Sequence, residues 1–249
     1  MCTLVTLRRP GHDWPVLIAA NRDERQDRPW RRPARHWPDR PEVIAGMDEL
    51  AGGSWLGVND HGVVAAILNR VGSLGPEPGK RSRGELVLEA LDHADAADAA
   101  EALSALDGRA YRTFNMVIVD SRDAFWLRHT GQPAIECAPL PSGLSMLTAH
   151  DLDSPESARV RFHRPRFEAA AAPDPAAGRW SSWETLLASR ESEPDSAPFG
   201  AMRVETDTGF GSVNASLIAL PAPRPGAVRP LWRFAAGAPG RTPFEDVRA

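Results

Sequence analysis

The chain has 249 residues and a formal net charge of −4, with 29 basic and 33 acidic residues. A balance this close to neutral gives no global attraction to nucleic acid or to an anionic membrane surface. Two cysteines are too few for a disulfide framework, and no apolar run approaches the roughly 18 residues of a membrane span. We therefore expect a cytoplasmic protein with a sizeable core, no nucleic-acid partner and no stable membrane insertion.

The N-terminal part of the chain predicts strands joined by turns. Residues 2–9 and 15–20 are apolar runs on either side of a turn, which favours a hairpin. Residues 25–42 are rich in Arg, Pro and Trp and show no periodicity, so they predict a long irregular loop. Further strands are expected at 52–58 and 63–68.

The rest of the chain predicts alternating helices and strands. Ser82–Glu85 is expected to open a helix through Leu91, and apolar spacing of three and four predicts a second helix at about 94–106. Residues 155–172 are a candidate helix with Pro165 as a possible break, and a capping box at Ser181 predicts a further helix. Strands are expected at 114–119, 124–128, 144–148, 215–220 and 230–234. Strand pairs that alternate with helices are typical of layered sheets covered by helices, here in one domain over 1–249.

Cys2 directly follows the initiator methionine. Cysteine is small, so we expect an aminopeptidase to remove Met1 and leave a thiol and a free α-amine on one residue. The amine, with a reference pKa of about 8, can take the proton of the thiol, which then acts as a nucleophile. The alternative is a cysteine that stands by chance at the start of an apolar strand.

Asn21, Arg22, Asp23 and Glu24 form a polar block at the end of the second predicted strand. On a functional interpretation, Asp23 hydrogen-bonds the Cys2 amine and Arg22 lowers the pKa of the thiol. Asn21 and Glu24 would then contact the substrate. The alternative is a solvated turn with an ion pair.

Other polar or aromatic residues are candidates for the same site. Asn69 ends a strand, where a carboxamide can donate into an oxyanion hole, worth about 3 kcal/mol, or simply form a turn. Trp30 lies in a loop rich in arginine, and it could line a pocket for an apolar or anionic ligand. The alternative is simple packing within the loop. His150 lies in a polar cluster that is either a substrate-facing loop or a solvated turn. Gly52–Gly53 indicates a bend or a close backbone approach, and no His or Cys spacing indicates a metal site.

Taken together, these residues resemble the NRDE family, also called the transport-and-Golgi-organisation family. The matching landmarks are Met1–Thr3, Asn21–Glu24, Gly52–Asn59, Val63–Arg70 and Ser82–Leu86. Their order and spacing cover the first third of the chain. Phe114–Asn115 and Phe210–Ser212 extend the match more loosely.

That family is in turn similar to N-terminal-nucleophile (Ntn) hydrolases of the choloylglycine and penicillin V acylase type. The resemblance implies an α+β fold, a four-layer αββα sandwich with mostly antiparallel sheets. It also implies that Cys2 is the nucleophile, that Asp23 orients its amine and that Asn69 donates to the oxyanion. Arg22 would be the neighbouring positive charge.

The sequence also departs from the pattern of these hydrolases. Leu147–His150 stands where they carry a second oxyanion Asn, and the expected late-strand Arg is not evident near Asn214. We predict a Cys-dependent hydrolase that cleaves a linear carbon–nitrogen amide through an acyl-enzyme, with no cofactor.

The family is also implicated in haem handling and lipid homeostasis, which gives a second hypothesis. On that hypothesis the chain is a non-catalytic haem (or lipid) binding and trafficking protein on the same scaffold, with haem as cargo. Cys2, His36, His150 and the loop arginines are available as an axial ligand or as clamps for the propionates.

Overall fold

The structure is a computed structural model that describes residues 2–223 and 229–248. By their contacts these residues form two compact units, and each is described by itself. The first unit contains the chain up to Arg28 together with Pro141–Ala222 and Pro230–Val247. The second unit contains Pro29–Leu140 and short C-terminal pieces.

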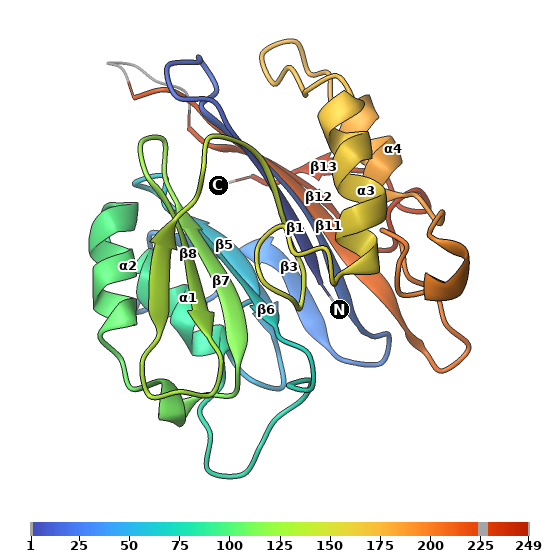
Figure 1. Cartoon of the computed structure of the whole chain (residues 1–249). Coiled ribbons are helices and arrows are strands. Elements are labelled where there is room, and N and C mark those ends of the chain that lie inside the picture. The colour runs from blue at the N-terminus through green and yellow to red at the C-terminus, as the bar shows by residue number, and fades with distance from the viewer. Residues whose placement is uncertain (1, 224–228, 249) are drawn as a thin grey trace. The chain divides into compact units, whose positions relative to one another are not determined.

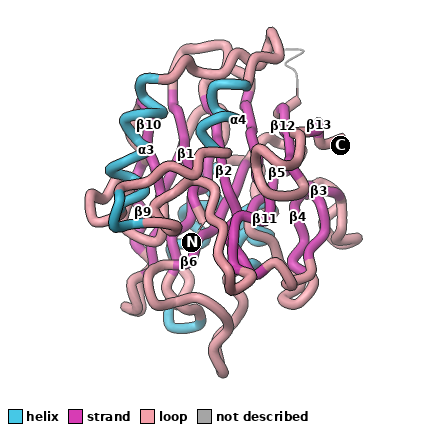
Figure 2. Tube along the Cα trace, turned by 90° about the vertical axis from the view of Figure 1, so that its right-hand side faces the viewer, coloured by secondary structure: helices cyan, strands magenta, loops and turns pink. Residues whose placement is uncertain are grey.

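The first unit is built on a six-stranded antiparallel sheet with the order β10-β1-β2-β11-β12-β13 (Figure 2). Its strands are β1 (Thr3–Arg8), β2 (Val16–Arg25), β10 (Gly143–Leu147), β11 (Phe210–Leu220), β12 (Leu231–Ala235) and β13 (Glu245–Asp246). Its helices are α3 (Ala158–Ala169) and α4 (Ser181–Leu187), and a short 3-10 helix, η2, covers Pro194–Ser196. The central hairpin of β1 and β2 is the one that the sequence predicts.

Helices α3 and α4 cover one face of this sheet (Figure 1). Successive side chains of a strand point to opposite faces, so every second residue reaches the helices. Val5, Ala19 and Leu217 do so and form one core cluster with Phe167 of α3 and Trp183 of α4. Burial of each large apolar side chain stabilises the unit by about 1.5–3 kcal/mol.

The second unit is built on a seven-stranded antiparallel sheet with the order β3-β4-β5-β6-β7-β8-β9. Its strands are β3 (Trp30–Ala34), β4 (Val43–Asp48), β5 (Leu56–Asn59), β6 (Val64–Asn69), β7 (Phe114–Val119), β8 (Ala124–His129) and β9 (Glu136–Pro139). Its helices are α1 (Gly84–Leu91) and α2 (Ala96–Ser104), followed by the 3-10 helix η1 (Gly108–Ala110). Apolar residues of α1 and α2 form a core cluster with alternate residues of the sheet.

Gly53 lies against Gly84, where α1 begins. A Cβ atom on Gly53 would lie 2.5 Å from the carbonyl carbon of Gly84, which no real contact allows. The neighbouring Gly52 has φ = 71°, a conformation that favours glycine. The bend and the close backbone approach predicted for Gly52–Gly53 are both confirmed.

The strand predictions were wrong at several places, one of which is β11, predicted at 215–220 but beginning at Phe210. β2 does not end before Asn21 but runs to Arg25, because β1 and β11 pair with its polar end from both sides. β3 lies inside the loop predicted for 25–42, and the strand predicted at 52–58 begins only at Leu56. Strands β4, β9 and β13 lack the apolar alternation that marks a strand in sequence.

The helix predictions hold in position but not in every detail. α3 continues through Pro165, which the sequence marked as a possible break. α4 begins at Ser181 as predicted, but its N-cap residue is Trp180 and no side chain caps it. The capping box predicted at Ser181 is therefore wrong, although the helix itself is confirmed.

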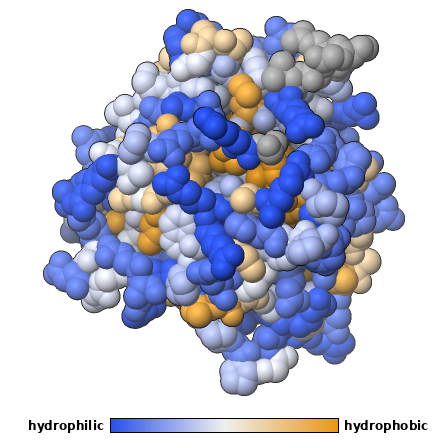
Figure 3. Space-filling view, turned by 180° about the vertical axis from the view of Figure 1, so that it is seen from behind, coloured by the Kyte–Doolittle hydropathy of each residue, from blue (hydrophilic) through white to orange (hydrophobic). Residues whose placement is uncertain are grey.

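Hydrophilic side chains dominate the molecular face in Figure 3, with scattered hydrophobic residues between them. Within residues 2–223 and 229–248, no helix combines the length and the hydropathy that a membrane-spanning segment needs.

Candidate functional site

The four polar residues Asn21–Glu24 lie within β2, so their side chains alternate between the two faces of the first unit's sheet. Asn21 and Asp23 point to the face that α3 and α4 cover. Arg22 and Glu24 belong to the opposite face. A continuous strand therefore splits this polar block into two chemically different pairs.

Asp23 forms a buried ion pair with Arg159 of α3. Nη1 of Arg159 lies 3.0 Å from Oδ2 of Asp23, and the two side chains are 3% and 0% exposed. Ser212 of β11 donates from Oγ to Oδ1 of the same carboxylate over 2.6 Å. Both carboxylate oxygens are thus engaged by charged or hydroxyl donors, which fixes the orientation of Asp23.

Arg159 connects Asp23 to two further segments of the first unit. Its Nη1 also donates to Oγ1 of Thr3, the residue that follows Cys2. Its Nε and Nη2 donate to the carbonyl oxygen of Phe199 over 3.2 and 2.9 Å. The guanidinium therefore ties the start of β1, the end of β2 and the Phe199 segment together.

The sequence analysis missed Arg159 and Ser212. A signal for Arg159 was present, because the residue stands in the first turn of α3, two positions after the N-cap Ser157. A positive charge is disfavoured there by the helix dipole, so its presence indicates a partner elsewhere. Ser212 lies in the Phe210–Ser212 stretch that extends the family match, but its role follows only from the pairing of β11 with β2.

The thiol of Cys2 contacts the backbone of Asp23. Sγ of Cys2 donates to the backbone carbonyl oxygen of Asp23 over 3.8 Å. Burial raises the pKa of the Cys2 thiol above its usual value, and the Asp23 carboxylate adds to the rise. Arg22 acts in the predicted direction and lowers the same pKa, but burial outweighs it. The thiol is consequently protonated at neutral pH and needs a base to become a nucleophile.

Asn21, a predicted substrate contact, holds the fold of the first unit. Its Nδ2 donates to the carbonyl oxygens of Leu187 and Met202, both over 2.9 Å. These two bonds use both hydrogens of the amide nitrogen, so that nitrogen has none left for a ligand.

Glu24 and His150, the other predicted substrate contacts in this unit, each have a charged neighbour. Glu24 accepts from the backbone N–H of Arg25 over 2.9 Å and lies 3.8 Å from the Arg28 guanidinium. Nδ1 of His150 lies 3.4 Å from a carboxylate oxygen of Glu156. These contacts leave their substrate roles as predictions.

Asn69 and Trp30 belong to the second unit. Asn69 is the last residue of β6, as predicted, and its Nδ2 donates to the carbonyl oxygen of Arg70 over 3.3 Å. Trp30 packs edge-on against Trp55 with ring centroids 5.9 Å apart. The structure thus groups Cys2, Arg22 and Asp23 in one unit and these two residues in the other.

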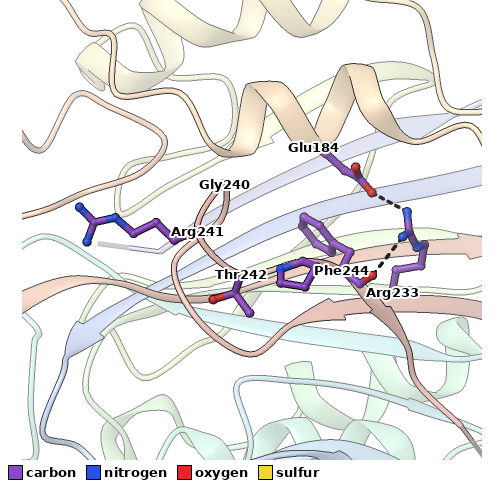
Figure 4. Close-up of a pocket in the computed structure, with 7 residues that line it drawn as sticks. Glu184, Arg233, Gly240, Arg241, Thr242 and Phe244 are labelled. Atoms are coloured by element: carbon purple, nitrogen blue, oxygen red, sulfur yellow. Dashed lines mark hydrogen bonds and ion pairs between the residues drawn. The ribbon is translucent and has the colours of Figure 1, made fainter.

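A shallow pocket of about 330 Å³ also lies in the first unit (Figure 4). Glu184 and Arg233 form an ion pair at its edge, and Arg233 donates to the carbonyl oxygen of Phe244 over 3.1 Å. The lining residues are Glu184, Arg233 and Gly240–Phe244. Because Cys2 is not among them, we assign this pocket no chemistry.

Residues 1–195 match the model of the family described as "Transport and Golgi organisation 2". The chain belongs to this family. The Transport and Golgi organisation 2 homolog of Mus musculus is 35% identical over 108 residues, or 42% of the chain and 38% of that protein. The homolog of Homo sapiens is 34% identical over 110 residues, with the same coverage. The matched stretch therefore spans about two fifths of the length of these relatives.

Solved structures similar to this member of the Transport and Golgi organisation 2 family are Ntn hydrolases. An N-acylethanolamine-hydrolyzing acid amidase ortholog of Caenorhabditis elegans matches with a TM-score of 0.57 and 12% identity, over 87% of this chain and 92% of that one. Penicillin V acylase from Agrobacterium tumefaciens matches with 0.52 and 13%, over 95% and 83%. A variant of conjugated bile acid hydrolase from Clostridium perfringens matches with 0.54 and 13%, over 100% and 97%. At these identities the likeness shows the fold alone, and it confirms the predicted α+β fold of the Ntn-hydrolase type.

Across the described residues, no group of three or more His, Cys, Asp or Glu side chains is arranged to hold a metal ion.

Proposed function

We propose that this chain is an N-terminal-cysteine hydrolase that cleaves a linear carbon–nitrogen amide bond. One observation carries the proposal: Sγ of Cys2 lies 3.8 Å from the backbone oxygen of Asp23, whose carboxylate is paired with the buried Arg159. An N-terminal nucleophile can use its own amine as base, and a carboxylate held in one orientation nearby can position that amine. The fold shared with an amidase, an acylase and a bile acid hydrolase supports the same reaction class.

The reaction begins after removal of Met1 exposes the α-amine of Cys2. The amine takes the thiol proton, and Sγ forms a bond to the carbonyl carbon while the carbonyl electron pair moves onto oxygen. The carbon–nitrogen bond then breaks, and the leaving nitrogen takes the proton from the ammonium group. Water attacks the resulting thioester with the amine again as base, and the carbon–sulfur bond breaks to restore the thiol.

Four other residues have proposed roles in these reaction steps. Asp23 accepts a hydrogen bond from the Cys2 amine and orients it, and Arg159 holds that carboxylate in place. Arg22 stabilises the thiolate by its charge. By the family resemblance, Asn69 donates a hydrogen bond to the oxyanion. The amine is essential because burial raises the pKa of the thiol.

The test combines protein mass with turnover. Loss of one methionine from the intact mass of an untagged protein is expected. A panel of linear amides is then incubated with wild type, Cys2→Ala and Cys2→Ser, and Cys137→Ser serves as the matched control. Cys2→Ala is expected to abolish hydrolysis with the fold intact by circular dichroism, while Cys137→Ser retains it. Retention of Met1, or full activity of Cys2→Ala, would overturn the proposal.

The alternative function, non-catalytic haem or lipid binding, stays a prediction. Titration of wild type and Cys2→Ala with haem tests it, since a carrier gives a saturable shift of the Soret band. Non-saturating behaviour would count against haem binding.

A further inference from the structure

A β-bulge in β11 separates two polar side chains that a regular strand would keep together. Ser212 pairs with Asp23, but Asn214 pairs with Arg22, so Val213 is an extra residue. In a regular strand, residues two apart share a face. The bulge instead turns Asn214 to the face of the sheet opposite α3 and α4, and re-aiming of a side chain is a typical use of a bulge beside an active site.

Asn214 carries an unused hydrogen-bond donor on that face. The residue is 1% exposed, and its Nδ2 has no hydrogen-bond partner among the described residues. A buried polar group without a partner costs free energy, and native proteins nearly always satisfy such groups with protein, water or a ligand. The bulge has therefore placed a donor where it is costly unless something binds to it.

The neighbours of Asn214 indicate the chemistry of a ligand that would fit there. Arg22 lies directly across the ladder from Asn214, and cross-strand partners have Cβ atoms about 5 Å apart. On the other edge of β2, Thr3 pairs with Asn21. Cys2 precedes Thr3 by one residue, so it lies across from Arg22. Three adjacent strands thus present, in order, a thiol, a guanidinium and a carboxamide.

A guanidinium has only donors, and the Asn214 nitrogen offers two more. Such a set matches a carboxylate, which accepts hydrogen bonds on both oxygens and carries the opposite charge. Cys2 and Asn214 are separated by one strand, so their backbones are about 10 Å apart. A ligand that reaches both side chains has its carboxylate only a few bonds from the carbonyl that the thiol attacks.

We propose that Asn214 and Arg22 bind a carboxylate of the substrate, so that the amide cleaved is that of an N-acyl amino acid. This inference rests on the proposed hydrolase function. It adds Asn214 as a residue that determines substrate specificity. The β11 bulge would then serve to turn Asn214 toward the substrate carboxylate.

The test is a binding measurement that needs no turnover. Calorimetry on Cys2→Ala compares N-octanoylglycine with N-octanoylethanolamine, which share the acyl chain and the amide and differ in a carboxylate against a hydroxymethyl group. The glycine conjugate is expected to bind at least about tenfold more tightly. Asn214→Ala in the same background is expected to remove most of this preference, and Asn214→Asp to reverse it by repulsion. Ser216→Ala, two residues along the same face, is the matched control and keeps the preference.

Several outcomes would overturn the inference. These are equal binding of the two amides, binding of neither, or an unchanged preference in Asn214→Ala. An ordered water on Nδ2 would give equal binding. Turnover of the same two amides by wild type separates this inference from the proposed function. Preferential binding without hydrolysis would leave the carboxylate site standing and remove the hydrolase. Hydrolysis of both amides without a binding preference would leave the hydrolase standing and remove the carboxylate site.

Discussion

Arg159 and Asp23 join helix α3 to strand β2 through an ion pair 3.0 Å long that is almost completely buried. A pair so far from water is costly to break from one side, because the remaining charge stays buried. The same guanidinium holds Thr3, the neighbour of Cys2, so the pair governs both stability and the geometry of the nucleophile.

Replacement of Arg159 by Met is expected to destabilise the protein by about 3–5 kcal/mol, since it removes the cation beside a buried carboxylate. Urea unfolding at pH 7 measures the change. Addition of Asp23→Asn is expected to recover part of the loss, which a double-mutant cycle detects as coupling.

Arg161 provides the control for this prediction. It lies two residues further along α3 and pairs with Glu193 at 2.6 Å, but its side chain is 42% exposed. Arg161→Met is expected to cost no more than about 1 kcal/mol, as for other surface ion pairs. Equal losses in Arg159→Met and Arg161→Met would contradict the role given to burial.

Replacement of Arg22 by Met is expected to slow alkylation of Cys2. The positive charge of Arg22 lowers the pKa of the thiol, so its loss raises that pKa and reduces the thiolate fraction at a given pH. The rate of iodoacetamide labelling, resolved for Cys2 by peptide mass spectrometry between pH 7 and 9, measures the effect. Labelling of Cys137 in the same sample is the internal control, and an unchanged ratio of the two rates would refute the prediction.

His163 is expected to make the protein acid-sensitive. Burial, helped by the charges of Arg159 and Arg166, lowers the pKa of His163 to about 4, and a hydrogen bond between Nε2 and the carbonyl oxygen of Glu191 opposes this only in part. The folded-state pKa lies below the unfolded value of about 6.5, so the unfolded chain binds more protons between these pH values. Stability is therefore lost as pH falls from about 6.5 to 4, by about 3 kcal/mol in total.

Urea unfolding of wild type and His163→Gln at several pH values tests this dependence. Gln keeps a hydrogen-bonding side chain but does not titrate, so the variant should lose less stability between pH 6.5 and 4.5. The prediction fails when the two proteins show parallel pH profiles.

Gly53→Ala is expected to destabilise the second unit by more than about 2 kcal/mol. The added Cβ would lie 2.5 Å from the backbone of Gly84, and a backbone at a helix start cannot easily yield. Gly52→Ala is the comparison, because its Cβ meets open space and pays only for φ = 71°, about 1–2 kcal/mol. In thermal unfolding, the midpoint temperature of Gly53→Ala should be lower than that of Gly52→Ala. The opposite order would be incompatible with the close approach of Gly53 to Gly84.

Most of the strands and helices could be predicted because their apolar periodicity is local. The hairpin of β1 and β2 and helices α1 and α2 are clear from the sequence in this way. The end of β2 was not, since polar residues there stay in a strand only because β1 and β11 pair with them.

The candidate site was predictable only as far as its motif reached. Cys2, Arg22 and Asp23 stand out in the sequence, and the structure groups them. Arg159 and Ser212 come from segments 136 and 189 residues away from Asp23, and only tertiary contacts reveal them. In the sequence, Asn214 was noted only because the expected late-strand arginine is not evident near it. Its role was not predicted, because a β-bulge cannot be recognised in a single sequence.

The passage of β2 through Asn21–Glu24 has a consequence for how this segment can change over time. Single replacements alter one face of the sheet and leave the other intact, so each face can vary independently. An insertion or deletion of one residue would exchange the two faces at once, and would send Asp23 away from Arg159. We therefore expect this segment to tolerate single substitutions far better than insertions or deletions.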